Sequence, residues 1–136
     1  MFKRGDVVWV NLISTDATSR QNGSRPAILV NNNKCLEYSP VVHIVPLTSK
    51  SKKMLPTHVE INKSEYPIKM DSMAMCEQIT LISKEQIISE KAEFTLNNIT
   101  MIKINIAIII QFGLMMFFKN YSQYSQIENN VVYNTI

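Results

Sequence analysis

Short β-strand-like segments fill the first two thirds of the sequence, and one long helix-like segment follows them. The predicted strands are rich in Val, Ile or aromatic residues and lie between turn-forming residues: Asp6–Leu12, Pro26–Val30, Val41–Pro46, Thr57–Ile61 and Ser72–Ile82. A series of strands followed by a helix is typical of the mainly β class with some α structure. We therefore predict a small barrel or curled sheet with a C-terminal helix.

The predicted helix is apolar on both faces. One face carries Ile99, Ile102, Ile106, Ile109, Ile110 and Gly113 behind Thr95 as the N-cap, and the reverse face carries Met101, Ile104, Ile108 and Met115. The apolar run over residues 104–118 is shorter than the roughly 20 residues of a membrane-spanning helix, and Asn105 and Gln111 interrupt it. A helix that is apolar on both faces needs a second surface to pack against, so we predict a homodimer.

The composition is that of one compact domain. The chain has 136 residues, of which 46% are hydrophobic and 18% charged, enough to bury a core. Its net charge of +3 favours a polyanion or an acidic protein as partner, although so small an excess is also common on ordinary surfaces. The first residues lack the apolar core of a signal peptide and the two cysteines form no dense framework, so we predict a cytoplasmic protein. Residues 119–136 are polar, which suits either a mobile tail or an added edge strand.

Arg25 and Pro26 stand side by side at the predicted start of a strand. Proline fixes its own φ angle and steers the preceding residue into extended conformations, so the backbone of Arg25 is held in the β region. Because proline lacks an N–H, it suits the first position of a strand. Arg25 is thereby placed at the rim of the sheet, after the polar loop Ser14–Ser24, and sites are common on such rims.

A second polar cluster follows Pro46, where another predicted strand ends. The segment after it reads Leu47-Thr48-Ser49-Lys50-Ser51-Lys52-Lys53. Hydroxyl and ammonium donors suit phosphate oxygens, and phosphate contacts supply most of the non-specific affinity for nucleic acids. A Ser/Lys run by itself is more often a solvated loop, so this cluster indicates a nucleic-acid site only together with other motifs.

Four motifs resemble, in their order and spacing, the endoribonuclease toxins of the MazF/PemK family: "KRGDVVWVNL", "GSRPAILVNNN", "PLTSKSKKMLPTHVEI" and "DSMAMCEQITLI". The resemblance covers about residues 2–118 and implies a toxin domain over residues 1–118, with a small SH3-like (CcdB/PemK-like) antiparallel β-barrel and a C-terminal helix. It implies a homodimeric toxin of a toxin–antitoxin system that cleaves single-stranded mRNA at specific sequences without a metal or another cofactor. It also implies a MazE-like antitoxin whose acidic C-terminal segment lies across the dimer.

The resemblance assigns the catalytic roles to Arg25 and Thr48. The candidate RNA-binding residues are Arg20, Gln21, Ser49, Lys50, Lys52, Lys53, Glu77 and Gln78. Cleavage of RNA through its own 2′-hydroxyl requires stabilisation of the charge that develops on the phosphorane. A guanidinium suits this role because it offers paired donors to phosphate oxygens and stays charged, while the Thr48 hydroxyl can hold the phosphate. The products of this route are a 2′,3′-cyclic phosphate end and a 5′-hydroxyl end.

The chain departs from the family pattern at two places. Many relatives carry an acidic residue, Gln and a glycine pair ahead of the Arg-Pro motif, whereas here the loop reads Ser19-Arg20-Gln21-Asn22-Gly23-Ser24. Relatives usually place a basic residue near the position of Thr80, and its absence removes one phosphate contact. We expect these departures to affect base selectivity and rate rather than the mechanism.

Several polar residues have structural alternatives. His43 and His58 lie in predicted strands, where a lone histidine is more often packed and hydrogen-bonded than catalytic. Glu77 either orients Arg25 or contacts a base, or it pairs with a neighbour. Cys76 suits the core, because nothing near it indicates a lowered pKa. Two His and two Cys without short-range spacing predict no metal site. The alternative function is a non-catalytic SH3-like binding module, or a degenerate toxin that inhibits a protein target.

Overall fold

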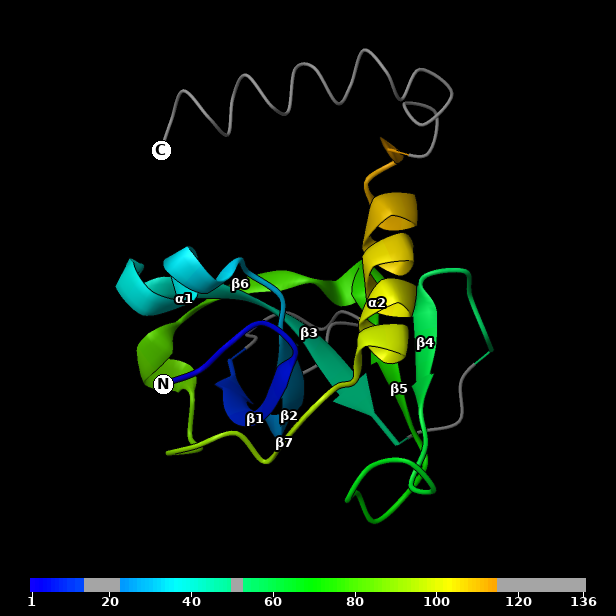
Figure 1. Ribbon diagram of the computed structural model, residues 1–136, viewed down its shortest axis with the longest axis horizontal. Helices are drawn as coiled ribbons and strands as arrows, with labels where there is room; N and C mark the ends of the chain where they lie inside the picture. Colours follow the sequence, from blue (N-terminus) through cyan, green and yellow to red (C-terminus); the bar gives the residue numbers. More distant parts are fainter. Residues whose placement is uncertain (14–22, 50–52, 115–136) are drawn as a thin grey trace.

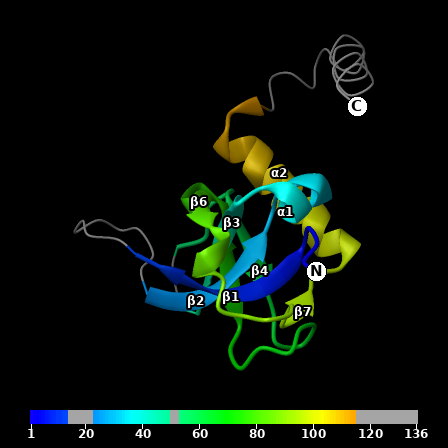
Figure 2. The same ribbon diagram turned by 90° about the vertical axis from the view of Figure 1, so that its left-hand side faces the viewer.

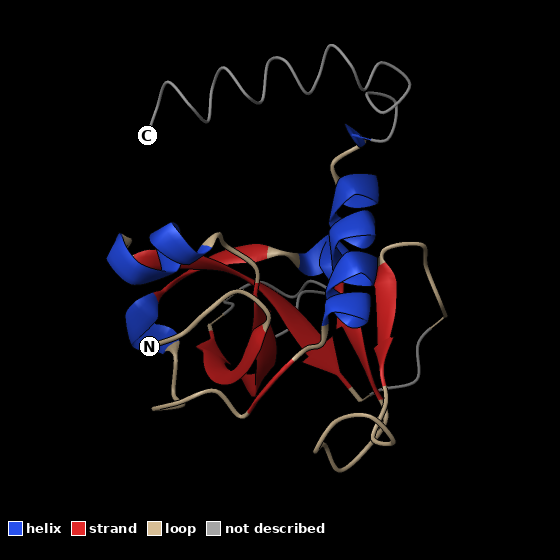
Figure 3. Cartoon of the chain, viewed as in Figure 1, coloured by secondary structure: helices blue, strands red, loops and turns tan. Residues whose placement is uncertain are grey.

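The computed structural model describes residues 1–13, 23–49 and 53–114 (Figure 1). Its strands are β1 (Asp6–Leu12), β2 (Gly23–Leu29), β3 (Val41–Thr48), β4 (His58–Ile61), β5 (Ser72–Met75), β6 (Thr80–Ser83) and β7 (Phe94–Thr95). Its helices are α1 (Asn33–Tyr38) and α2 (Asn98–Gln111), with the 3₁₀ helices η1 (Cys76–Gln78) and η2 (Lys84–Gln86). The predicted mainly β class with a C-terminal helix is confirmed (Figure 3). Within the described ranges, no helix is long and apolar enough to cross a membrane.

The sheet curls because β3 changes partner along its length. Residues 41–44 of β3 pair with β6, whereas Leu47 and Thr48 pair with β5. On its other side β3 pairs with β2, and the strand order is β4-β5-β3-β2-β1-β7, with every pair antiparallel. Helix α2 packs against β4 and η1, and two perpendicular views show it beside the curled sheet (Figures 1 and 2).

The central strands are buried on both faces. In β1, Val7 belongs to a core cluster that includes Ile104 of α2, whereas Val8 belongs to a second cluster that includes Leu36 of α1. A strand covered on both faces does not alternate between apolar and polar residues. This explains why the strands in the sequence read as nearly continuous apolar runs.

The predicted strand over Ser72–Ile82 is wrong in one respect: it is two strands joined by η1. Strand β5 pairs with the end of β3, and β6 pairs with its beginning, so the chain must turn a corner between them. The corner is closed by a hydrogen bond from the Ile79 N–H to the Cys76 carbonyl (3.3 Å). Glu77 therefore lies on a 3₁₀ turn rather than on a strand.

The predicted N-cap of the C-terminal helix is also wrong. Helix α2 begins at Asn98, and the side chain of Asn97 caps it by accepting a hydrogen bond from the Thr100 N–H (2.9 Å). Thr95 instead lies in β7 opposite Asp6, and its hydroxyl donates to the Asp6 carboxylate (2.7 Å). Pairing with β1 thus holds Thr95 in a strand and occupies the hydroxyl that would cap the helix.

Only one face of α2 packs on the sheet. Ile104 and Ala107 are buried, and Met101 and Ile108 pack against the same core. The opposite face is exposed: Ile99 is 69% accessible, Ile102 56% and Ile106 46%. The structure therefore shows an uncovered isoleucine face within the described chain, which is the feature from which the homodimer was predicted.

Candidate active site

Arg25 and Thr48 come together where β2 and β3 separate. The two strands are paired through Leu29–Ile44, Ile28–Val45 and Ala27–Pro46, and the ladder ends there. The next two steps of the same register set Pro26 opposite Leu47 and Arg25 opposite Thr48. Beyond this point β2 pairs only with β1, and β3 pairs with β5. The two predicted catalytic residues therefore lie where the ladder between β2 and β3 ends.

Both residues are among those that line a cavity of about 540 Å³, which we call the Arg25 cavity. Its lining residues are Val7, Trp9, Ser24, Arg25, Pro26, Leu47, Thr48, Ser49, Pro67, Ile68, Lys69, Met70, Ser72, Glu93 and Phe94. The lining includes Ser24, Arg25, Thr48 and Ser49 from the ends of β2 and β3. This set of donors suits an anionic oxygen.

Arg25 lies within β2 rather than at its mouth, because β2 begins at Gly23 and not at Pro26 as predicted. Arg25 pairs with Val10 and Pro26 pairs with Trp9, so strand pairing with β1 supports the extended backbone that Pro26 also favours. Pro26 lies just before the ladder to β3 begins, where β2 is an edge on that side. The fixed backbone thus sets the direction in which the Arg25 side chain leaves the strand.

Burial lowers the pKa of the Arg25 guanidinium through desolvation. A guanidinium begins so far above neutral pH that it keeps its charge despite this shift. Thr48 is buried at the end of β3, two residues beyond the predicted strand end at Pro46. A partly desolvated cation beside a buried hydroxyl binds an anion more strongly than the same groups in water.

Three other predicted RNA-binding residues line a second cavity, of about 840 Å³, which we call the Glu77 cavity. Lys53, Glu77 and Gln78 line it together with Thr80 and His58. Ser49 is the one predicted RNA-binding residue that lies with Arg25 and Thr48 among the residues described. Arg20, Gln21, Lys50 and Lys52 lie outside the described residues.

Glu77 pairs with two neighbours, as the second of its two predicted alternatives has it, and its contact with RNA stays a prediction. Its Oε1 atom is 2.8 Å from His58 Nε2, and its Oε2 atom accepts a hydrogen bond from the Thr57 hydroxyl (3.1 Å). The Leu55 N–H donates to His58 Nδ1 (3.2 Å), so the ring proton lies on Nε2 and is donated to Glu77. This arrangement was missed in the sequence, because Thr57 and His58 lie about twenty positions before Glu77.

Neither histidine lies in the Arg25 cavity. The His58 side chain is 2% exposed and fully hydrogen-bonded, as predicted for a structural histidine. His43 is exposed on β3 and contacts the Asn31 side chain (Nδ1 to Nδ2, 3.3 Å). Burial, with a smaller contribution from the Glu77 charge, raises the pKa of the Cys76 thiol to about 12, so Cys76 is an unreactive core residue.

No group of three or more His, Cys, Asp or Glu side chains in the described ranges is arranged to hold a metal ion. Arg25 lines the Arg25 cavity, and an arginine cannot coordinate a cation. The site is therefore suited to anion binding by hydrogen-bond donors.

Comparisons with known proteins agree on one family. Residues 3–112 match the family described as PemK-like, MazF-like toxin of type II toxin–antitoxin system. Endoribonuclease MazF of Staphylococcus saprophyticus subsp. saprophyticus is 37% identical over 115 residues, which cover 84% of this chain and 93% of that protein. Endoribonuclease MazF of Staphylococcus epidermidis is 36% identical over the same coverage.

Solved structures share the fold. An endoribonuclease from a mycobacterial species, in complex with its cognate antitoxin, superposes with a TM-score of 0.65 at 24% identity, covering 84% of this chain and 97% of that one. MazF from Deinococcus radiodurans superposes with a TM-score of 0.67 at 15% identity, covering 82% of this chain and 96% of that one. The curled sheet with its C-terminal helix is thus the architecture of these proteins.

Proposed function

The chain belongs to the family of PemK-like, MazF-like toxins of type II toxin–antitoxin systems, and on this premise we propose that it cleaves single-stranded mRNA at specific sequences. The observation that carries the proposal is that Arg25 and Thr48 both lie just beyond the end of the ladder between β2 and β3. The family resemblance assigns catalysis to these two residues, and both line one cavity.

The proposed reaction uses the substrate's own 2′-hydroxyl as nucleophile. Its oxygen forms a bond to the adjacent phosphorus while its proton is removed, and the bond from phosphorus to the 5′-oxygen breaks as that oxygen gains a proton. The Arg25 guanidinium stabilises the additional negative charge on the non-bridging oxygens, and the Thr48 hydroxyl holds the phosphate. The products are a 2′,3′-cyclic phosphate and a 5′-hydroxyl. No metal-bound water is needed as nucleophile.

We propose that the residues that recognise the RNA differ from those that carry out the chemistry. Phosphate contacts from Ser49 and the lysines of residues 50–53 would add affinity for every sequence, whereas Glu77 and Gln78 would contact bases. Hydrogen bonds from Thr57 and His58 fix the Glu77 carboxylate and favour this role, because a held acceptor can discriminate between base edges. Arg20 and Gln21 would act from the loop before β2.

The proposed partners are a second copy of the chain and a cognate antitoxin in the cytoplasm. The exposed isoleucine face of α2 supports a homodimer, which needs a buried interface on the order of 1,200 Å² or more. The mycobacterial relative was solved with its cognate antitoxin. We propose that a MazE-like antitoxin places an acidic segment over the same basic surface as RNA, so that the two ligands exclude each other.

The proposal is tested by incubating the purified full-length protein with a long RNA in the presence of EDTA and mapping the 5′ ends of the fragments. We expect discrete cuts that carry 5′-hydroxyl and 2′,3′-cyclic phosphate ends. A 2′-deoxy sugar on the 5′ side of a mapped cut should abolish cleavage there. Intact RNA would indicate a binding module or a degenerate toxin, and a 5′-phosphate product would refute the assigned chemistry.

A further inference from the structure

The Arg25 side chain leaves the sheet on the side that carries the Glu77 cavity. Arg25 pairs with Val10 of β1, and residues paired across antiparallel strands point to the same face. Leu12, two positions beyond Val10 in β1, shares that face and lines the Glu77 cavity. Arg25 therefore lines one cavity and directs its side chain to the side of the sheet that carries the other.

The Thr48 side chain lies on this side too. Ala27 is two positions from Arg25 and pairs with Pro46 of β3, so Pro46 points the same way as Arg25. Thr48 is two positions beyond Pro46, and Pro46 lines the Glu77 cavity. A phosphate held by the two proposed catalytic residues therefore lies on the same side of the sheet as this cavity, whose volume of about 840 Å³ has room for a base.

The Glu77 carboxylate is held by a hydrogen bond on each oxygen. His58 Nε2 donates to Oε1 (2.8 Å), and the Thr57 hydroxyl donates to Oε2 (3.1 Å). The backbones are fixed to one another as well, since the N–H of Cys76, next to Glu77, donates to the Thr57 carbonyl (3.0 Å). The carboxylate therefore has a fixed position in the cavity lining, although the Glu77 side chain is 26% exposed.

The pair of His58 and Glu77 keeps a negative charge. The Leu55 N–H donates to His58 Nδ1 (3.2 Å), so the ring is a neutral donor that orients the carboxylate without cancelling its charge. A carboxylate accepts about four hydrogen bonds, two on each oxygen. The bonds from His58 and Thr57 therefore leave each oxygen able to accept one more.

These remaining positions suit an RNA base that carries an exocyclic amino group. Adenine, cytosine and guanine present such N–H donors, and the unpaired bases of single-stranded RNA are read by hydrogen bonds to their edges. Uracil has no amino group, and a carboxylate repels its carbonyl oxygens. An acidic peptide is disfavoured for the same reason. The Glu77 carboxylate therefore favours an amino-bearing base over uracil and over a carboxylate ligand.

We propose that Glu77 selects a base with an exocyclic amino group at one position of the RNA, and that His58 and Thr57 are the positioning residues that hold its carboxylate. This subsite rests on the proposed function and deepens it, because it names the class of base that the proposed contact of Glu77 accepts. His58, whose side chain is 2% exposed, thereby affects base selection without contacting the RNA.

A double-mutant cycle between Glu77 and the amino group tests the contact. The full-length protein is titrated into an end-labelled RNA that contains the mapped cut and is uncleavable because of a 2′-deoxy sugar there. Each adenine, guanine or cytosine is replaced in turn by its analogue without the amino group. We expect one position at which this change weakens binding to the wild type by roughly 5- to 150-fold, the range for one well-placed contact between a side chain and a base. Glu77→Leu should lose this effect, and Glu77→Gln should lose part of it.

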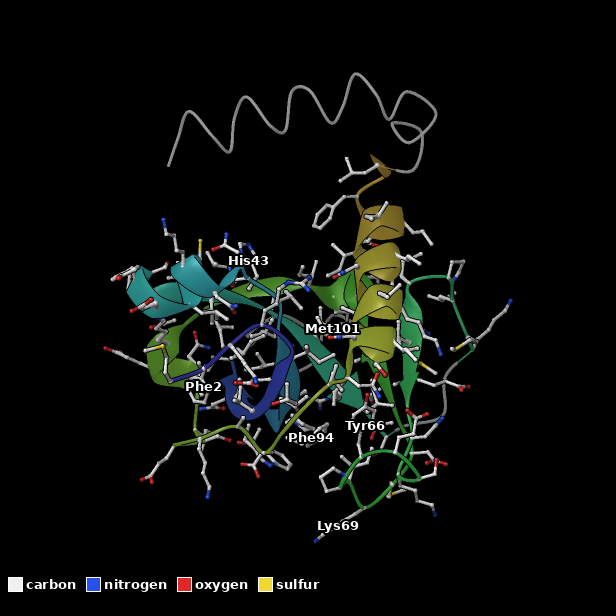
Figure 4. The ribbon with its side chains drawn as sticks, viewed as in Figure 1. Phe2, His43, Tyr66, Lys69, Phe94 and Met101 are labelled. Atoms are coloured by element: carbon white, nitrogen blue, oxygen red, sulfur yellow. The ribbon has the colours of Figure 1, made fainter. Side chains whose placement is uncertain are left out.

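Variants of the positioning residues separate base selection from folding. Thr57→Val and His58→Leu each remove a hydrogen bond to Glu77 and should reduce the discrimination at that position by roughly 2- to 12-fold, the scale of one hydrogen bond. Thr57→Ser and His58→Gln keep a donor and should restore most of it. Discrimination at the other positions should not change, although a purely structural defect would weaken all of them. His43→Gln is the matched control, because His43, labelled in Figure 4, is an exposed histidine on β3 outside the lining of the Glu77 cavity.

The outcomes separate this subsite from the function on which it rests. If RNA is cut but the loss of each amino group costs as much in Glu77→Leu as in the wild type, the subsite is refuted and the nuclease function stands. Unchanged discrimination in folded Thr57→Val and His58→Leu would overturn the positioning role. If Glu77→Leu alters only the affinity for an acidic antitoxin peptide, the cavity belongs to the antitoxin and the proposal is equally overturned. Coupling at one position of a single-stranded RNA that the wild type binds but never cuts would support the subsite and refute the nuclease function.

Discussion

Replacing Arg25 by alanine is expected to slow RNA cleavage by about a hundredfold. Removal of one preorganised donor to a developing oxyanion costs about 2.7–4 kcal/mol, or roughly a hundred- to a thousandfold in rate. Arg25 is only partly buried, so solvent screens part of its interaction, and we expect the lower end of that range. Binding of uncleavable RNA should fall far less, because the stabilised charge develops mainly in the transition state.

Arg25→Lys separates charge from geometry. An ammonium keeps the positive charge but lacks the planar pair of donors, so this variant should also be impaired, though less than Arg25→Ala. Single-turnover cleavage of an RNA with a mapped cut gives the rate, fluorescence titration with the 2′-deoxy RNA gives the affinity, and thermal unfolding shows that the variants are folded. A folded Arg25→Ala protein that cleaves within about threefold of the wild-type rate would refute the assigned role.

Three further predictions address the rest of the molecule. Thr48→Val keeps the shape of this buried side chain and should lose at least about tenfold in single-turnover cleavage rate. Thr48→Ser should lose less, because the hydroxyl remains. Rates equal to that of the wild type would show that Thr48 has no role in the site. The pKa of the Cys76 thiol is raised to about 12, so Cys76 should stay protonated and resist iodoacetamide at pH 8 in the folded protein. The partly exposed Cys35 should react. Mass spectrometry after digestion identifies the labelled residue. The double variant Ile102→Glu and Ile106→Glu should convert the proposed dimer into a folded monomer, because both side chains are exposed on α2. Analytical sedimentation measures the change. An unchanged sedimentation coefficient would place the interface elsewhere.

Local chemistry in the sequence determined most of the elements. Val- and Ile-rich runs between turn formers identified β1 with its observed bounds, and the periodic isoleucines identified α2. Arg25, Pro26 and Thr48 were also visible in the sequence, because a proline beside an arginine and a hydroxyl run after a strand are local patterns with local physical causes.

Element boundaries depended on pairing partners that local patterns do not reveal. Thr95 is a good N-cap by type, but pairing with Asp6 on β1 places it in β7 and engages its hydroxyl, so Asn97 caps α2 instead. The break between β5 and β6 likewise follows from the two different segments of β3 with which they pair. Both outcomes depend on contacts between residues far apart in the chain.

The geometry of the site could be known only from the tertiary structure. The pairing of β2 with β3 decides that the ladder ends just before Arg25 and Thr48. The curl of the sheet brings Thr57 and His58 to Glu77. Sequence alone nominated the residues for the chemistry, because side-chain type and neighbours are local properties. The structure decided which of them lie close together, because strand register and sheet curvature depend on pairing across the whole chain.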